Sequence, residues 1–442
     1  SYQDLAGLYK ADLLDKYSLK LEYFKRNDDA PTDPSLNPPS RFNDLQSDNT
    51  TIKTSVNLGY KDKDFKVRTY FSSYEQEKID RETKEATTKK IETTSLKVDK
   101  SQASISFGAE LYKDKLFGVK KSQANESDTA GYPNAESDNY MGYASKNIAL
   151  NESLELDFGL RLDSYRLSAQ DSELDNKSAS DLSKSFGIKA RPTNEIETFV
   201  NYSEGFNAPS LNEVYPTGLH IPSDDEYFRN NVFIPNEDLV YEKSSTREIG
   251  LKYQTLTSET DIIEFGISFY ESKVKNYITR EQLDKSIFDD EDGTTQFVNI
   301  KNVTLYGAEV SANYNRDDLS LGMTYSKVRG QDLKTNEFIQ DLPADEYRLS
   351  TKYYLDKYDL NLGHELSYTE EQNRVNPNTL QRTGATPDYL VHNIFVQKTI
   401  QDIRLDFRIN NLSNIKYKKH ASFLYETERD YKFGLKYKIN TF

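Results

Sequence analysis

Apolar and polar residues alternate with a period of two in segments along the whole chain. The clearest run places an aliphatic or aromatic residue at every second position, at Leu154, Leu156, Phe158, Leu160 and Leu162. Successive side chains of an extended strand point to opposite faces, so the run predicts a strand with one apolar and one charged face. Similar runs begin at Ile263, Leu319 and Ile403. The sequence therefore predicts β-strands throughout.

The composition narrows the choice of β architecture. Hydrophobic residues make up 36% of the 442 residues, and the mean hydropathy is -0.81. Such polarity is typical of disordered chains, but these are poor in aromatic residues, whereas this sequence has 32 Tyr and 22 Phe. It also lacks the roughly 18 consecutive apolar residues that a transmembrane helix needs. A transmembrane antiparallel β-barrel fits, because its strands bury one face in lipid while the other lines a polar lumen.

The predicted connections alternate between two lengths, as they do in outer-membrane barrels. Short turns are expected at residues 60–64, 150–153, 192–195, 315–318 and 355–358. Long polar connections are expected at residues 27–49, 75–94, 170–181, 218–241, 280–295 and 370–386. With an unpaired last strand after Thr427, the hairpins give roughly nineteen strands. Because bacterial single-chain barrels have even strand numbers, we expect further strands outside this chain.

Charge and motif content exclude two large classes of function. A formal net charge of -15 argues against a nucleic-acid partner, since phosphate binding uses clustered Lys and Arg. The chain has no Cys nucleophile, no Gly-x-Ser-x-Gly elbow and no phosphate-binding loop. We therefore expect a protein that is not an enzyme.

One forty-residue region combines two short motifs with a histidine between them. Its first box is Phe206, Asn207, Ala208 and Pro209, and its second is Asn236, Glu237, Asp238 and Leu239. His220 lies between them. The layout resembles the FRAP and NPNL or NPDL boxes that bracket a haem-binding histidine in TonB-dependent haem and haemoprotein receptors of Gram-negative outer membranes. Two positions depart from that pattern, because Asn207 replaces Arg and Glu237 replaces Pro.

The likeness to this family covers nearly the whole chain. Residues 131–139 resemble its YPGAESD loop, and residues 160–165 resemble the strand that follows. Residues 248–253 are similar to the strand after the second box. Residues 299–309 and 410–417 resemble strand and pre-terminal motifs that recur in all TonB-dependent receptors. Only the His220 region points to haem.

The resemblance implies that residues 1–442 belong to one receptor β-barrel, with no plug domain in this chain. The family's barrel has about twenty-two strands, so the plug and about three strands would precede Ser1. The implied protein is integral to the outer membrane, in contact with lipid and lipopolysaccharide. It would take haem, as a transported ligand, from a haemoprotein, and the TonB complex in the periplasm would drive import.

The resemblance makes His220 the candidate axial ligand of haem iron, because neutral imidazole is a common haem ligand. The alternative is a solvated loop histidine. Tyr215, Tyr227 and Phe228 are candidate haem contacts or packing residues. His420 is an accessory contact or a surface residue. His364 shares a strand face with Leu360, Leu362 and Leu366 and is expected to point outward rather than to bind a ligand.

Two other functions remain open at this point. One is a receptor of the same fold for another cargo, such as a ferric siderophore or cobalamin. The other is a passive structural or adhesive barrel without cargo. Unchanged haem affinity after replacement of His220 would favour the first, and a plug with a TonB-binding segment upstream of Ser1 would exclude the second.

Overall fold

The structure is a computed structural model of residues 1–442. It describes residues 2–13, 15–31, 46–80, 86–121, 133–170, 174–216, 218–221, 231–258, 260–283, 294–339, 341–375, 384–422 and 425–437. No helix in these ranges is both long and apolar enough to cross a membrane.

One curved antiparallel sheet contains nearly all of the described residues. Its first ten strands are β1 (Tyr2–Leu13), β2 (Tyr17–Pro31), β3 (Gln46–Asp62), β4 (Phe65–Asp80), β5 (Ala86–Gln102), β6 (Ile105–Lys121), β7 (Ala135–Asn151), β8 (Leu154–Ala169), β9 (Lys177–Ala190) and β10 (Ile196–Asn207). The other long strands are β13 (Glu242–Leu256), β14 (Ile262–Leu283), β15 (Thr294–Arg316), β16 (Leu319–Asp332), β17 (Glu346–Leu355), β18 (Leu360–Thr369), β19 (Tyr389–Ile400), β20 (Ile403–Asn410) and β21 (Asp430–Tyr437). These nineteen described strands confirm the predicted number.

Four short elements lie outside this series. The helix α1 (Leu211–Val214) and the strands β11 (Gly218–Ile221) and β12 (Asn231–Phe233) occupy the connection between β10 and β13. The 3-10 turn η2 (Asp356–Tyr358) connects β17 to β18.

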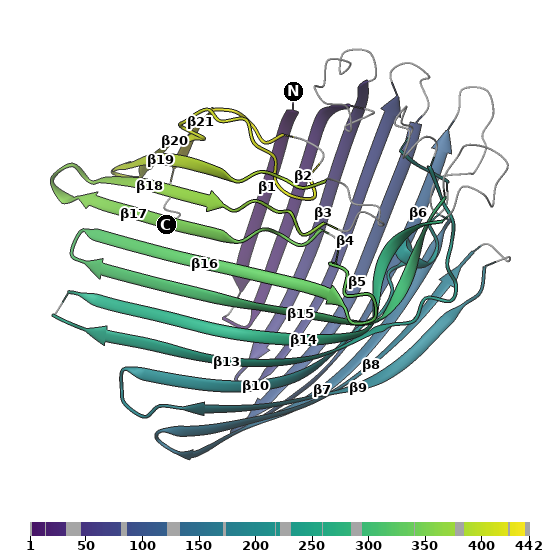
Figure 1. Ribbon diagram of the computed structural model, residues 1–442, viewed down its shortest axis with the longest axis horizontal. Helices are drawn as coiled ribbons and strands as arrows, with labels where there is room; N and C mark the ends of the chain where they lie inside the picture. The colour runs from purple at the N-terminus through teal and green to yellow at the C-terminus, as the bar shows by residue number, and fades with distance from the viewer. Residues whose placement is uncertain are drawn as a thin grey trace.

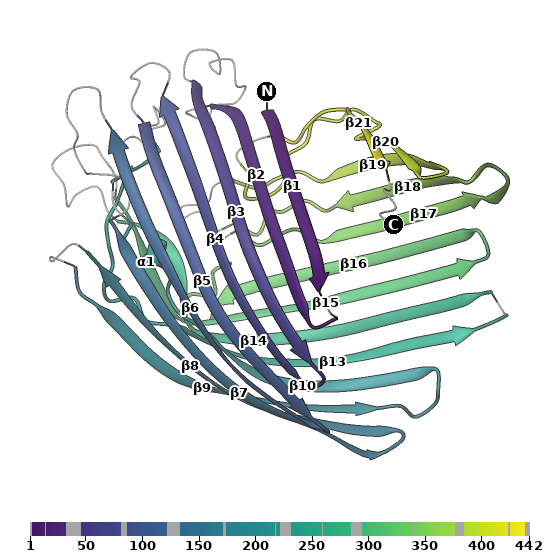
Figure 2. The same cartoon turned by 180° about the vertical axis from the view of Figure 1, so that it is seen from behind.

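Each long strand pairs with its neighbour in the chain, and β10 pairs with β13. Figures 1 and 2 show the sheet curling into two opposed walls, with β1–β9 on one side and β13–β21 on the other. Among the described residues, β1 pairs only with β2, and β21 only with β20. The barrel wall is therefore open between these two strands in the part that the structure describes.

Connections at the two ends of the wall differ in length, as predicted. The short ones are residues 14–16, 63–64, 103–104, 152–153, 191–195, 257–261, 317–318, 356–359 and 401–402. Several contain a non-glycine residue with positive φ, such as Lys63 and Asp317, which is the backbone that tight hairpin turns need. The strand ends that border the remaining connections lie at the opposite end of the wall, which is called the loop end below, and all of these connections except residues 81–85 are longer than the short turns.

Four predicted loops are wrong in their extent. Residues 27–49 and 170–181 were expected to be connections, but β2 continues to Pro31, β3 begins at Gln46 and β9 begins at Lys177. Residues 75–94 and 280–295 were expected to be connections, but β4 continues to Asp80, β5 begins at Ala86, and β14 continues to Leu283. Strands that extend past the membrane need no apolar face, so their polar sequence resembles that of a loop. Residues 218–241 also contain the short strands β11 and β12.

The strand faces confirm the amphipathic wall. Phe158, Leu160 and Leu162 are 43%, 54% and 55% exposed on the outer face of β8, whereas Asp163 and Tyr165 are buried on its inner face. Phe269 of β14 is exposed in the same way. The apolar rows thus lie on the outside of the sheet and not in a core between two sheets, as a lipid-facing barrel requires.

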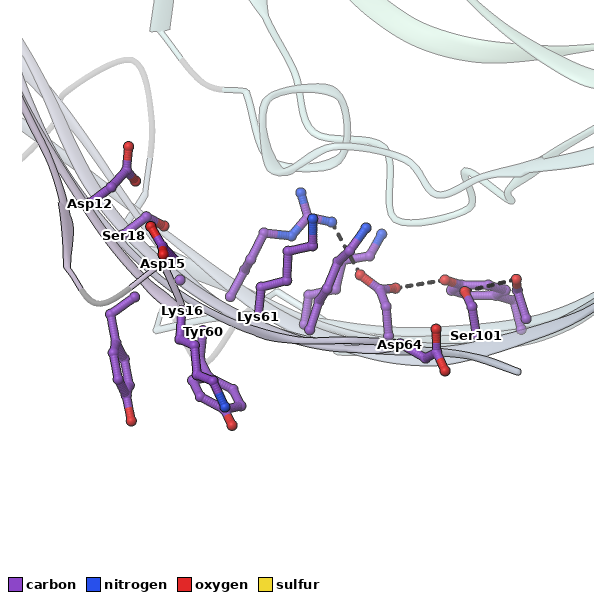
Figure 3. A pocket seen from close by; sticks show the side chains of 16 residues that line it. Asp12, Asp15, Lys16, Ser18, Tyr60, Lys61, Asp64 and Ser101 are labelled. Atoms are coloured by element: carbon purple, nitrogen blue, oxygen red, sulfur yellow. Dashed lines mark hydrogen bonds and ion pairs between the residues drawn. The ribbon is translucent and has the colours of Figure 1, made fainter. Parts of the chain in front are cut away.

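Aromatic rings gather on the outer face near the short turns. The ring centroids of Tyr17 and Tyr60 are 5.2 Å apart, and those of Tyr60 and Phe65 are 6.4 Å apart. In Figure 3 the ring of Tyr60 points away from the inner side, where Lys61 points. The inner side carries a recess of about 760 Å³ whose charged lining includes Lys61, Arg68, Lys97 and Asp99. The sequence has no Trp, and these Tyr and Phe rings lie where outer-membrane barrels carry interfacial aromatic residues.

Candidate functional site

The two boxes lie at the two ends of the connection between β10 and β13. Phe206 and Asn207 end β10, and Ala208 and Pro209 follow directly. Residues 236–239 of the second box come just before β13 begins at Glu242. Both boxes lie at the loop end, where a receptor would meet its ligand.

The first box joins the connection to the wall through one ring and one amide. The Phe206 ring lies 5.8 Å from that of Tyr165 and 4.9 Å from that of Tyr241. The Asn207 side chain donates a hydrogen bond of 2.7 Å to one carboxylate oxygen of Glu242. The other Glu242 oxygen accepts a 2.7 Å hydrogen bond from the Ile278 backbone N–H. Glu242 therefore links the end of β10 to β14, although Asn207 stands where the family has Arg.

The second box is held mainly through backbone atoms. The Asn236 backbone N–H donates to the Val214 carbonyl at 2.9 Å, and its side-chain amide donates to the Phe297 carbonyl at 2.7 Å. The Asn236 side-chain oxygen accepts from the Asp238 N–H at 2.9 Å, which makes an Asx turn. Glu237 accepts a 3.0 Å hydrogen bond from the Asp175 N–H. Glu237 thus connects this box to the segment before β9.

Two amide side chains of β15 form hydrogen bonds with the backbone on both sides of the second box. Asn299 accepts from the Val240 N–H at 2.9 Å and donates to the Val240 carbonyl at 3.0 Å, so its amide imitates a neighbouring strand. Asn299 also donates to the Asn276 carbonyl at 2.7 Å, and Gln296 donates to the Pro235 carbonyl at 2.9 Å. We call Asn236, Gln296 and Asn299 the amide clamp.

A buried apolar cluster lies under both boxes. It consists of Leu116, Ala135, Tyr165, Leu167, Leu211, Val214, Tyr215 and Leu239, with Phe206, Ala208 and Tyr241 packed against it. Leu239 has no exposed surface, and Pro209 is also fully buried. The two boxes, thirty residues apart in sequence, therefore share one anchor on the barrel wall.

Tyr215 has a packing role in this anchor. Its side chain has no exposed surface, and its hydroxyl donates a 2.8 Å hydrogen bond to the Asp175 carbonyl. Burial, with smaller contributions from Glu237 and Asp175, raises the pKa of Tyr215 to about 12, so the phenol stays protonated. A contact between Tyr215 and haem remains a prediction, and would need this ring to leave its buried position.

The segment that carries His220 is docked on the longest strand of the wall. β11, which contains His220, pairs with β12, and the register shifts between Leu219 and Ile221. β12 pairs in parallel with the first residues of β15, and the rings of Phe233 and Phe297 are stacked 5.8 Å apart. The backbone position of His220 is thus at an irregularity of this hairpin. Its side chain, together with Tyr227 and Phe228, lies outside the described residues.

His420 lies in the connection between β20 and β21, also at the loop end. Its Nδ1 is 3.4 Å from the hydroxyl oxygen of Thr386, which lies in the preceding long connection. Burial, with a smaller contribution from Arg374, lowers the pKa of His420. The nearby carboxylate of Asp341 opposes this effect, but the pKa remains below its usual value. The ring is therefore a neutral imidazole at neutral pH. No contact in the described part of the chain joins it to the two boxes.

A charged cluster joins β16 to the end of the connection between β16 and β17. The sequence did not predict it. Arg329 donates two hydrogen bonds to Asp345, and the Tyr325 hydroxyl donates to the same carboxylate at 3.1 Å. Arg374 lies 3.6 Å from it. Burial would raise the pKa of Asp345, but the hydrogen bonds from Arg329 and Tyr325 and the nearby cations lower it overall. No sequence signal predicts this pairing, because the partners come from β16 and from two separate connections.

The fold and these anchors define a class: a lipid-facing antiparallel barrel wall that presents structured connections at one end. Residues 1–412 match the family described as TonB dependent receptor-like, beta-barrel. The chain belongs to this family, whose barrels are found in the outer membranes of Gram-negative bacteria. Its members are receptors and transporters and not enzymes, which agrees with the missing catalytic motifs. The described residues contain no cluster of three or more acidic, Cys or His groups suited to a metal ion.

Sequence relatives carry haem-related names. The "Hemin receptor" of Yersinia pestis is 24% identical over 405 residues, which are 87% of this chain and 58% of the relative. The "Heme/hemopexin utilization protein C" of Haemophilus influenzae (strain 86-028NP) is 24% identical over 349 residues, 76% of this chain and 48% of the relative. The chain thus spans about half the length of the curated relatives it matches.

Solved structures show the same fold at low identity. The "Copper transporter OprC" aligns with a TM-score of 0.74 at 13% identity, over 99% of this chain and 71% of that one. The Serratia marcescens hemophore receptor HasR, in complex with its hemophore HasA and heme, aligns with a TM-score of 0.72 at 16% identity. That alignment also covers 99% of this chain and 71% of the other.

Proposed function

We propose that this chain is the barrel part of an outer-membrane receptor that binds haem, taken from a haemoprotein, and imports it with energy from the TonB complex. One observation carries the proposal. Both boxes converge on a single anchor, and the connection between them holds the hairpin that contains His220 against β15. The haem-related names of the sequence relatives support the same cargo.

In this proposal His220 supplies one axial nitrogen to the haem iron. A rigid base matters because a ligand on a loop binds well only if the loop is held near its bound conformation. The amide clamp and Leu239 provide that base, whereas His220 lies in the hairpin between the two boxes. Tyr227 and Phe228 are proposed to stack on the porphyrin, and His420 to make an accessory contact.

The open edges of the barrel wall bear on the parts of the receptor outside this chain. The unpaired edges of β1 and β21 among the described residues would each cost several kcal/mol per backbone group in lipid, so we propose that further strands close the wall. Residues 1–442 would then form one barrel domain, with the plug on a separate segment. Lipid and lipopolysaccharide would contact the outer face.

The test is a visible absorption titration of the full-length receptor with haemin. We expect a Soret shift on binding, and His220→Ala should weaken binding and change the spin-state bands. His364→Ala is the matched control, because His364 lies on the outer face of β18. Equal haemin affinity in the His220→Ala and unmodified receptors would reject His220 as the axial ligand.

Another cargo is the alternative within the same fold, since the structural neighbours include proteins named as copper, iron and siderophore transporters. A ferric siderophore or cobalamin receptor would show no saturable haemin binding in this titration. A passive barrel would, in addition, fail to support TonB-dependent growth on haem as the iron source.

A further inference from the structure

Two histidines meet on the outer face of the wall, far from the candidate haem site. His364 of β18 is on the same strand face as Leu362, and His392 of β19 is on the same face as Leu390. The register pairs His364 with Ile394 and Leu366 with His392, so the two histidines are diagonal cross-strand neighbours. Their Nε2 and Nδ1 atoms are 3.2 Å apart, which is a hydrogen bond between imidazoles.

The pair lies within the apolar band. Toward the loop end, the rings of Tyr347 and Tyr368 stand 6.2 Å apart on the same outer face. Toward the short turns, Tyr353 is 44% exposed beside Leu362. Between these aromatic levels, the neighbours of the histidines are aliphatic except for Thr351, which is directly opposite His364: the others are Leu349, Leu362, Leu366, Leu390 and Ile394. Ionisable residues at such positions are costly and rarely without function.

Hydrogen bonding within the pair leaves two ring nitrogens unused. An imidazolium is costly against lipid, and a neutral imidazole carries one N–H and one lone pair on its two ring nitrogens. One N–H and one lone pair form the 3.2 Å bond. Neither ring has another hydrogen-bond partner among the described residues. One donor and one acceptor therefore face lipid, which cannot form a hydrogen bond with either of them.

We propose that the His364–His392 pair is a docking point for a second copy of this receptor within the bilayer. Two-fold symmetry brings the free N–H of each pair to the free nitrogen of the other, so the surface is complementary to itself. The surrounding aliphatic side chains of both copies then pack around four connected imidazoles. A partner without a matched donor and acceptor would leave one of these groups unpaired.

Site-specific cross-linking tests the contact, since residues 1–442 contain no Cys. Leu390→Cys places one thiol beside His392, and Leu160→Cys places one on the outer face of β8 as a matched control. The full-length receptor in native outer-membrane vesicles is treated with a short bismaleimide. We expect several-fold more covalent dimer from Leu390→Cys than from Leu160→Cys or from the unmodified receptor.

A second set of variants tests the hydrogen bonds themselves. Adding His364→Leu and His392→Leu to Leu390→Cys keeps the face apolar, so folding is preserved, and should reduce the cross-linked dimer to the Leu160→Cys level. Equal yields from Leu390→Cys and Leu160→Cys would overturn the proposal. So would a dimer that survives both Leu substitutions, or one that disappears on chelation with EDTA, which would show a metal bridge instead.

Discussion

Truncation of Leu239 to Ala should loosen the connection that carries His220 without touching the proposed ligand. Leu239 has no exposed surface and contributes to the cluster beneath both boxes. Replacing a buried Leu by Ala costs about 2 to 5 kcal/mol, from lost transfer free energy and the cavity left behind. A loss of about 2 kcal/mol already raises the population of the undocked state roughly thirtyfold.

Hydrogen exchange at the second box measures this change directly. The backbone N–H groups of Leu239 and Asn236 donate to the Asn236 and Val214 carbonyls, so they exchange only when the segment leaves the wall. In Leu239→Ala their exchange should accelerate at least roughly thirtyfold. Haemin affinity should fall by no more than the same factor, because binding uses only the docked fraction.

Val240→Ala is the matched control, because Val240 is 43% exposed and its own contacts with Asn299 are made by backbone atoms. It should exchange at the rate of the unmodified receptor. If both variants exchange alike, the buried cluster does not hold the connection, and the argument from the shared anchor fails.

Three further outcomes follow from other parts of the wall. Gly307→Ala should lower the yield of folded barrel, because its Cβ would meet a backbone oxygen of β16, whereas Gly7→Ala has open space and should fold normally. Asp345→Asn should destabilise the connection between β16 and β17 by about 3 to 5 kcal/mol, measured by hydrogen exchange, since it leaves the buried Arg329 without its anion; unchanged exchange would contradict the pairing. The lowered pKa of His420 means that the undocked loop binds more protons, so docking should weaken as the pH falls below about 6.5, and His420→Asn should remove this dependence.

Strand number and facing could be predicted from the sequence because lipid imposes a simple rule. A run such as residues 154–162 must turn every second side chain outward, and the short turns between such runs are unambiguous. The rule no longer applies where strands leave the bilayer. For that reason the outer parts of β4, β5 and β14 were mistaken for loops, and the hairpin of β11 and β12 was not predicted.

The sequence placed the two boxes at the ends of one connection, but it could not predict the contacts that hold them there. The boxes marked the ends of the connection correctly, and both meet at the predicted loop end. The amide clamp joins residues about sixty positions apart, such as Val240 and Asn299, and no local pattern encodes such a contact. The same holds for the His364–His392 bond: the alternation predicted that His364 points outward, but the cross-strand register decides its partner.

The amide clamp forms hydrogen bonds with backbone carbonyl and N–H groups. Every residue has both groups except proline, which lacks the N–H. Asn299 forms hydrogen bonds with the backbone of Val240, and Gln296 and Asn236 each donate to a backbone carbonyl. None of these bonds therefore depends on the side chain of the residue that supplies the backbone group. The side chain of Val240, which is exposed, can therefore change while the bonds from Asn299 stay in place. Exposed positions of this connection could thus diverge between related receptors without any change in the barrel beneath it.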